Sequence, residues 1–387
     1  MKVVGEISIS ARQINNLASA IGQELAADRD ARTKQYVNRE LPREASSVDV
    51  QVDLAAVFFD GGRMRTRVPD QGRGVHQPHW RETKNAGFHR MKSQSSAKDP
   101  QPELPDCFRN EAYVEKLVKG LKCLKNEARE EEAEAGQSSP AIATPVETSP
   151  AQAVSWQPET LFRTCLSSLA SSEDFGPMMA AEADGRGFFT AKKKAFVGDG
   201  QSYNWTIQQR WFPDFVPIAD FLHAVEYIHT AAKTIHADST LRWQQYLQWS
   251  TACWQGEVTK VIADLHDWQL RFGPLPEGEK VPETDPRKIL HTVATYLTHS
   301  CSRMDYPRYR REGLPVTSSL AESLVKQISK RVKGTEKFWN DGPSGEAILQ
   351  LRAAVISDGD RLERWVGNRP ISPFSPRCRS TMPANAT

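Results

Sequence analysis

The pattern of apolar and polar residues along the chain predicts helices at both ends and short buried strands between them. Residues 8–28 carry apolar side chains at helical spacing, and the charged residues 29–46 that follow predict a connector. The same periodicity predicts a helical block at 240–300 and further helices at 108–125, 160–171, 173–186, 202–212, 223–234 and 343–357.

Three apolar runs predict strands of one sheet. The run 48–60 alternates at first and then turns continuously apolar, which is typical of a strand that enters the middle of a sheet. Residues 194–198 form a second run, and residues 215–219 form a third, in which Pro217 predicts an edge strand or a very short one.

Two of these strands are predicted to end in an aspartate that a glycine follows. Asp60 precedes Gly61 and Gly62, and Asp199 precedes Gly200. Carboxylates at strand ends often bind metal ions, whereas an Asp-Gly pair is also an ordinary turn. Both interpretations stay open for each aspartate at this point.

Residues 63–67 and 79–91 also alternate and predict further strands of the same sheet. Arg63, Arg65 and Arg67 then share one face. Such a row either contacts phosphates or forms the solvated face of an edge strand.

The stretch 313–339 predicts an amphipathic helix after Pro315, with Thr317, Ser318 or Ser319 available as N-cap and Gly334 available to end or bend it. Its apolar stripe consists of Leu320, Leu324, Val325, Ile328 and Val332. A separate stripe begins with Glu322 and continues through the basic residues Lys326, Lys330, Lys333 and Lys337.

Glu322 at the head of this lysine stripe has two interpretations. A carboxylate that leads a row of lysines suits a metal ligand beside a phosphate-binding surface. Equally, Ser319 and Glu322 fit a capping box, and Glu322 with Lys326 forms an ordinary pair one helical turn apart.

Two further segments carry candidate chemistry. Asp220 and His223 follow the third strand and are expected near the site, although a helix N-cap with a packed histidine explains them as well. Residues 303–311 predict a basic loop with interleaved tyrosines, in which Arg310 is a candidate DNA contact. The tryptophans of 240–300 are expected to form a helical core rather than base-stacking surfaces.

Composition narrows the classes of protein. The 50 basic residues are nearly balanced by 48 acidic ones, so a DNA-binding surface has to come from local segregation of charge. Six scattered cysteines and no Cys-x-x-Cys pair argue against a disulfide scaffold and fit a reducing cytosol. We expect no secretion signal and no membrane span, and we expect the acidic, Ser- and Pro-rich stretch 127–158 to be a disordered insertion.

Five motifs in order resemble one known family. They are Phe-Phe-Asp60-Gly-Gly-Arg, His79-Trp-Arg-Glu-Thr-Lys, Phe-Val-Gly-Asp199-Gly, Asp220-Phe-x-His223-Ala-Val-Glu-Tyr and Gly313-Leu-Pro-Val-Thr-Ser-Ser-x-x-Glu322-Ser-x-x-Lys-Gln. Together they resemble the ISKra-type DDE transposases of bacterial insertion sequences, over about residues 10–372. The segment from Arg331 to Trp339 is also similar to theirs.

The resemblance implies an α/β (α+β) fold of the RNase H-like type, a mixed sheet flanked by helices with an all-helical insertion before the last acidic residue. Asp60, Asp199 and Glu322 are then the DDE triad and hold Mg²⁺ (or Mn²⁺). Lys326, Lys330, Lys333, Arg63, Arg65 and Arg310 are the expected DNA contacts, and Asp220 and His223 support the site.

The implied activity is phosphodiester hydrolysis at the ends of an insertion sequence, followed by attack of the freed 3′-OH on target DNA. Transposon ends and target DNA are the implied partners, together with a homo-oligomer on DNA in a bacterial cytoplasm, associated with the nucleoid. The expected division of the chain is an N-terminal helical segment 1–46, core parts 47–235 and 303–368, a helical insertion 236–302 and a disordered tail 369–387.

Two rival hypotheses remain. Family members usually have a longer region before the first strand, so this chain is alternatively a truncated, non-mobilising remnant that only binds DNA. Paired carboxylates also occur in glycosidases, although a lysine stripe argues against a neutral sugar substrate.

Overall fold

The computed structural model describes residues 10–40, 53–67, 79–126, 156–276, 281–332, 339–340 and 343–369. Within these ranges, the side chains of 123–126, 321–322, 330–331 and 340 are not described. Most of the expected insertion, the C-terminal tail after Arg369, and Lys333 lie outside the described residues.

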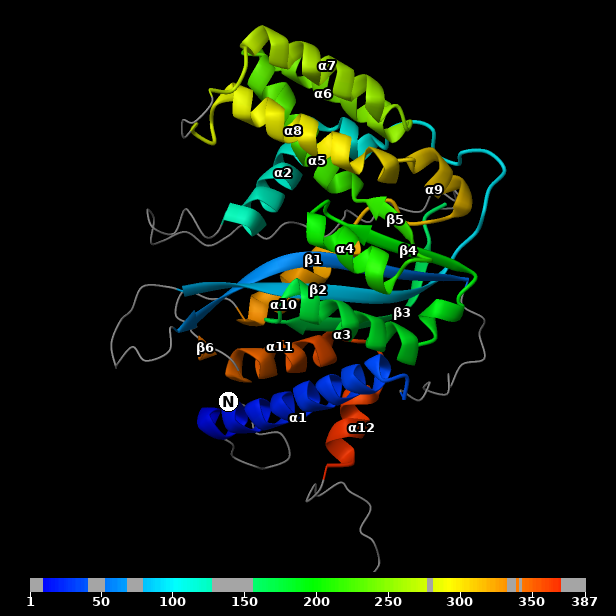
Figure 1. Cartoon of the computed structure of the whole chain (residues 1–387), viewed down its shortest axis with the longest axis vertical. Coiled ribbons are helices and arrows are strands. Elements are labelled where there is room, and N and C mark those ends of the chain that lie inside the picture. Colours follow the sequence, from blue (N-terminus) through cyan, green and yellow to red (C-terminus); the bar gives the residue numbers. More distant parts are fainter. Residues whose placement is uncertain are drawn as a thin grey trace, which may run out of the picture.

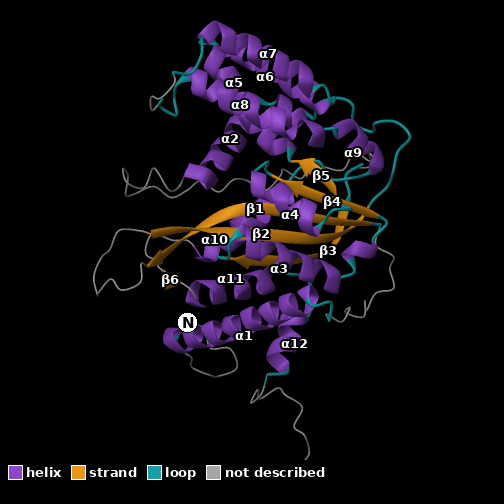
Figure 2. Ribbon diagram, in the orientation of Figure 1, coloured by secondary structure: helices purple, strands orange, loops and turns teal. Residues whose placement is uncertain are grey.

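A mixed β-sheet forms the centre of the molecule (Figures 1 and 2). Its strand order is β3-β2-β1-β4-β5, and β6 pairs with the far end of β1. β2 is antiparallel to both β1 and β3, whereas β4 is parallel to both β1 and β5. The strands are β1 (Leu54–Arg67), β2 (His79–Lys92), β3 (Glu159–Ser168), β4 (Lys193–Gly198), β5 (Val216–Ala219) and β6 (Trp339–Asn340).

β1 runs without interruption through Asp60, so the prediction that a strand ends there is wrong. Gly61 and Gly62 remain paired with Lys84 and Thr83 of β2 and form no turn. A Cβ atom on Gly62 would lie 2.6 Å from Thr83 Oγ1, so close packing rather than a turn requires glycine there. Pairing with β2 continues β1 past Asp60, where the sequence alone suggested that the strand ends.

Residues 160–171 are also not the predicted helix, because most of them form β3 beside β2. The last five residues of β3, 164–168, are buried, and so short a run has no periodicity that separates helix from strand. Pairing with β2, distant in the sequence, decides the outcome. Pro217, in contrast, lies in the short edge strand β5, as predicted.

Helices cover both faces of the sheet. On one face Phe59 of β1 stacks on Phe175 of α3 (Ser172–Gly185) and contacts Tyr203 of α4 (Ser202–Trp211). The other face is covered by α10 (Ser319–Val332) and α11 (Pro343–Ile356), whose apolar side chains form a second cluster around Met64 of β1. The predicted apolar stripe of α10 is confirmed, since Leu324, Val325, Ile328 and Val332 are buried.

The N-terminal helix α1 (Ala11–Val37) is longer than the predicted 8–28 and includes part of the expected connector. Its added turns carry two arginines in ion pairs: the buried Arg29 pairs with Glu346 of α11, and the half-buried Arg32 lies 3.9 Å from Glu182 of α3. A search for apolar periodicity overlooks such ion pairs. α1 therefore packs on α11 and α3, and the short helix α12 (Arg361–Gly367) follows α11 at the same end of the molecule (Figure 1).

The remaining helices gather beyond the β5 edge of the sheet (Figure 1). Their bounds are η1 (Asp106–Arg109), α2 (Glu111–Asn126), α5 (Phe221–Ile235), α6 (Ser239–Trp254), α7 (Val258–Phe272), α8 (Pro286–Ser300), η3 (Cys301–Arg303) and α9 (Tyr306–Glu312). The short helix η2 (Phe188–Thr190) lies instead beside α3. Trp249 and Trp254 are buried in this helical block, as predicted. No helix in the described part of the chain is long and apolar enough to cross a membrane.

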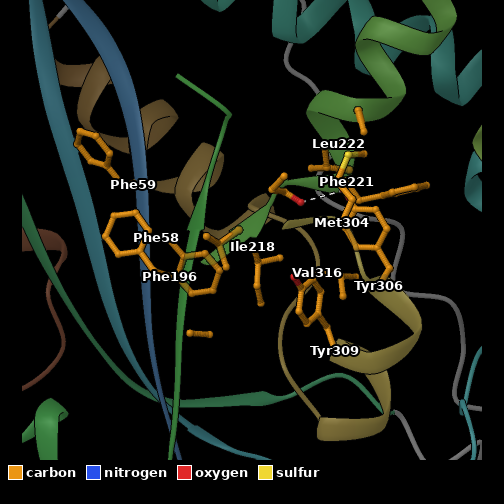
Figure 3. Packing of buried hydrophobic residues seen from close by; sticks show 14 of the residues in the cluster. Phe58, Phe59, Phe196, Ile218, Phe221, Leu222, Met304, Tyr306, Tyr309 and Val316 are labelled. Carbon is orange, nitrogen blue, oxygen red and sulfur yellow. Dashed lines mark hydrogen bonds between the residues drawn. The ribbon is translucent and has the colours of Figure 1, made fainter. Parts of the chain in front are cut away.

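The helical block shares one continuous apolar core with the sheet rather than forming a separate one. Figure 3 shows Phe196 and Ile218 of the sheet beside Val316, with Phe221 of α5 and Tyr306 of α9 just beyond. Residues 303–311 were expected to form a loop, but most of them belong to the helix α9, which Asp305 caps by accepting a hydrogen bond from the Arg308 N–H.

Candidate functional site

Three aspartates lie at the same level of three adjacent parallel strands. Phe59 of β1, Gly198 of β4 and Ala219 of β5 form the last in-register positions. The residues that follow them are Asp60, Asp199 and Asp220. Neighbouring strands lie about 4.8 Å apart, so the backbones of Asp60 and Asp199 are adjacent.

A tight turn fixes Asp199 directly after β4. Its Oδ1 accepts hydrogen bonds from the Gln201 N–H at 3.1 Å and from Asn204 Nδ2 at 2.6 Å. Gly200 has φ +96°, and a Cβ atom there would lie 2.5 Å from the ring of Tyr296 on α8. The Asp-Gly turn is thus confirmed, and the helical block packs directly against it.

Asp220 is completely buried and joins two distant segments. It caps α5 by accepting hydrogen bonds from the Leu222 and His223 N–H groups, and it contacts His223 Nδ1 at 2.6 Å. The Ser318 N–H donates a 2.6 Å hydrogen bond to Asp220 Oδ1 across 98 residues of sequence. Burial alone would raise the pKa of Asp220, but the hydrogen bonds from His223 and Ser318 outweigh it and lower that pKa.

This contact places the start of α10 beside the row of aspartates. Val325 lies against Gly62 of β1, with its Cγ1 3.5 Å from the position of a Cβ atom there. Glu322 precedes Val325 by almost one helical turn, so its backbone lies between Ser318 and the contact with Gly62. Because the Glu322 side chain is outside the description, its convergence with Asp60 and Asp199 stays a prediction.

A polar cluster that sequence reasoning missed lies beside the two aspartates. The Tyr203 hydroxyl is 3.2 Å from Glu82 Oε1, and Lys84 Nζ is 2.6 Å from Glu82 Oε2. The Lys84 Nζ also lies 4.2 Å from the centre of the Tyr203 ring. Burial raises the pKa of Tyr203, and the carboxylates of Asp199, Glu82 and Asp60 raise it further. The alternation of β2, with Glu82 and Lys84 two residues apart, was the available signal.

The predicted basic contacts fall into different environments. Arg63 is exposed and Arg65 is half-buried over the Trp80 ring, both on the β1 face that Lys84 shares. Lys326 is half-buried on α10. The side chain of Lys330 and the whole of Lys333 lie outside the described residues.

Arg310 is not a surface residue, and its prediction as a DNA contact is wrong. Its side chain is fully buried in α9, where its Nε donates a 2.8 Å hydrogen bond to Asp99. The guanidinium also donates to the Trp254 carbonyl and lies 4.1 Å from the centre of the Trp254 ring. These contacts satisfy the guanidinium of Arg310 inside the core, where it is not accessible to a phosphate.

The donor atoms at this edge suit a hard cation in part. Asp60 and Asp199 offer carboxylate oxygens, the ligands that Mg²⁺ and Mn²⁺ prefer, and Asn204 leaves Asp199 Oδ2 for such a role. Among the side chains that the structure describes, no three His, Cys, Asp or Glu residues group as a metal site. The resemblance assigns the third carboxylate to Glu322, whose side chain the structure does not describe.

Comparisons with protein-family models, curated proteins and solved structures gave no match.

Proposed function

We propose that this chain is a DDE transposase with an RNase H-like fold, which cleaves DNA with the help of Mg²⁺ (or Mn²⁺). The observation that carries the proposal is the register of β1 and β4, which sets Asp60 beside Asp199 although the sequence separates them widely. The helix α10, which carries a third acidic residue, Glu322, packs against β1 and β2.

The mixed sheet with helices on both faces supports the RNase H-like part of the proposal. So does the position of α6, α7 and α8 in the chain, between Asp220 and Glu322, since the resemblance implies a helical insertion before the last acidic residue.

Each residue has a defined part in the proposed reaction. Asp60, Asp199 and Glu322 would hold the metal ions, which, when bound, stabilise negative charge on the reacting phosphate. Asn204 and the Gln201 N–H keep the Asp199 carboxylate oriented, and Gly200 permits the turn that presents it. Asp220 and His223 fix the entry into α10, and through it the position of Glu322.

The test is a strand-cleavage assay with Mg²⁺ or Mn²⁺ on labelled DNA, in which wild type is compared with Asp199→Asn. This substitution keeps the shape of the side chain and its contact with Asn204 but removes a negative charge from the proposed metal site. We expect cleavage to fall by at least about a hundredfold, as is usual when a group that stabilises transition-state charge is lost.

Asp174→Asn is the matched control, because Asp174 is an exposed aspartate in the first turn of α3. It should cleave like wild type. Undiminished metal-dependent cleavage by Asp199→Asn would refute the proposed site. DNA binding by wild type without cleavage would instead favour a DNA-binding remnant.

A further inference from the structure

Tyr296 of α8 lies against the turn that presents Asp199. A Cβ atom on Gly200, the residue after Asp199, would lie 2.5 Å from Cε2 of the Tyr296 ring. The same ring stacks on Tyr227 of α5, with the ring centres 4.0 Å apart. Tyr227 follows His223 by about one helical turn, so the two lie on the same side of α5. Because α8 packs along α5 (Figure 1), it brings one tyrosine ring into contact with both α5 and the Asp199 turn.

The hydroxyl of Tyr296 is buried without a hydrogen-bond partner. Tyr296 is 9% exposed, and none of the described groups lies within hydrogen-bond range of its oxygen. Two other buried tyrosines nearby do have partners. The Tyr306 hydroxyl donates to the Ala219 carbonyl at 2.9 Å, and the Tyr246 hydroxyl donates to the Phe108 carbonyl at 3.1 Å. An unpaired buried hydroxyl costs free energy, so the Tyr296 hydroxyl indicates a partner that belongs to the site rather than to the fold.

The side-chain amide of Asn204 carries a second unpaired atom beside the same aspartate. Its Nδ2 donates a 2.6 Å hydrogen bond to Asp199 Oδ1, so the amide oxygen is on the side away from that bond. Asn204 is 1% exposed, and its Oδ1 has no partner within the described part of the chain. Because both atoms are bonded to one amide carbon, Asn204 Oδ1 lies within about 5 Å of Asp199 Oδ1. Two buried, unsatisfied polar atoms thus adjoin the Asp199 turn.

The surroundings of these atoms favour a cation over an anion. Asp199 and the completely buried Asp220 are carboxylates, and Asn204 Oδ1 can only accept hydrogen bonds. Burial raises the pKa of Tyr296 well above its usual value, and the charges of Asp220 and Asp199 raise it further, so its hydroxyl stays protonated at neutral pH. A ligand here has to supply both positive charge and hydrogen-bond donors. Hydrated Mg²⁺ supplies both, because it keeps several water molecules when carboxylates bind it.

We propose that Tyr296 and Asn204 are positioning residues that bind the hydration shell of a divalent cation at Asp199. The Tyr296 hydroxyl oxygen and Asn204 Oδ1 each accept a hydrogen bond from one of its water molecules. The helical block then contributes to the site itself, through α8, and not only to the core. The inference rests on the proposed function for the presence of the cation, although cation binding can be measured without DNA.

The experiment measures Mg²⁺ binding by isothermal titration calorimetry in the absence of DNA, with wild type and Tyr296→Phe as full chains. This exchange keeps the ring that stacks on Tyr227 and removes only the hydroxyl. We expect the affinity for Mg²⁺ to fall by about 10- to 100-fold, as is usual when a residue that binds the ligands of a metal is lost. Equal affinities would overturn the role of Tyr296, and so would a wild type that does not bind Mg²⁺.

Tyr246→Phe is the matched control, because Tyr246 is a buried tyrosine of the same helical block whose hydroxyl has a partner within the protein. Its affinity for Mg²⁺ should stay within about twofold of wild type, since distant sites act independently. An equal loss of Mg²⁺ affinity in the control would overturn the proposal.

Melting in EDTA separates this role from a purely structural one. Because the Tyr296 hydroxyl has no partner among the described groups, Tyr296→Phe should shift the melting temperature by less than about 2 °C without metal. Tyr246→Phe loses a hydrogen bond and should melt about 2–4 °C earlier than wild type. A larger shift for Tyr296→Phe than for the control would mean that the hydroxyl serves the fold, and would overturn the proposal.

The cleavage assay distinguishes this inference from the proposed function. Weaker Mg²⁺ binding by Tyr296→Phe, without any DNA cleavage by wild type, would support the contact with the hydration shell and contradict the proposed function. Equal Mg²⁺ binding by wild type and Tyr296→Phe, together with cleavage that depends on Asp199, would overturn the contact and support the proposed function.

Discussion

At the scale of single residues, Arg310 shows how a charged side chain becomes part of a core. Its cation is satisfied by Asp99, the Trp254 carbonyl and the Trp254 ring, and none of these contacts is local in sequence. A basic, tyrosine-rich segment therefore gave no indication that one arginine points inward while its neighbour Arg311 remains partly exposed.

The Arg310 pair yields a prediction for stability. Asp99→Asn leaves the buried guanidinium without its counterion, and we expect a loss of about 3 kcal/mol in the free energy of unfolding. Glu103→Gln is the control, because it disrupts an exposed pair with Arg109 and should cost less than about 1 kcal/mol. Urea unfolding measures both, and equal losses would contradict the assignment of Arg310 to the core.

At the scale of elements, Asp220 joins the start of α5 to the segment that enters α10. We expect Asp220→Asn to lower the free energy of unfolding by about 2–3 kcal/mol, because it weakens an N-cap and a buried charge-assisted network at once. Thermal melting would measure this loss.

Asp238→Asn is the matched control for this prediction. Asp238 caps α6 with one hydrogen bond from the Leu241 N–H and is exposed, so its loss should cost about 1 kcal/mol. A similar cost for the two aspartates would mean that the Ser318 contact contributes little.

The sequence predicted those elements whose periodicity is strong and local. The apolar stripe of α10, the helices predicted at 343–357 and 202–212, and the edge strand with Pro217 agree with the structure. The expected sheet membership of the strands that carry Asp60 and Asp199 is also correct. Their adjacency in the sheet could not be derived, because it depends on pairing between distant segments.

The errors have physical causes of the same kind. Residues 160–171 were predicted as a helix because the sequence does not show that β3 pairs with β2. The end of α1 was predicted too early because its arginines pair with Glu346 and Glu182, which are distant in the sequence. The cluster of Glu82, Lys84 and Tyr203 was missed because its members come from β2 and α4. Contacts between distant segments decide each case.

At the scale of the whole molecule, buried histidines make stability depend on pH. His89 is almost completely buried beside Phe58, and burial, together with repulsion by Arg163, lowers its pKa from 6.5 to about 3. Below about pH 6.5 the unfolded chain gains a proton on this residue that the folded chain does not. The folded state therefore loses stability as the pH falls from about 6.5 toward 3.

We expect a loss of about 2 kcal/mol from His89 between pH 6.5 and about pH 5, at roughly 1.4 kcal/mol per pH unit. His229, whose pKa burial lowers to about 4, adds to the same trend. His89→Gln should flatten the decline in urea midpoint over this range, whereas the exposed His266→Gln should retain it. The same decline in both variants would exclude His89 as its source.

The hydrogen bond between Ser318 and Asp220 has a consequence for synthesis of the chain. All strands that carry the aspartate row leave the ribosome about a hundred residues before α10, which at ~5–20 residues per second is a delay of about 5–20 s. Until α10 has been synthesised, Leu324 and Ile328 cannot cover Met64 and the adjoining face of the sheet. A nascent chain thus exposes apolar surface during this delay. The folding of α10 then covers this surface and adds Glu322 at the same time.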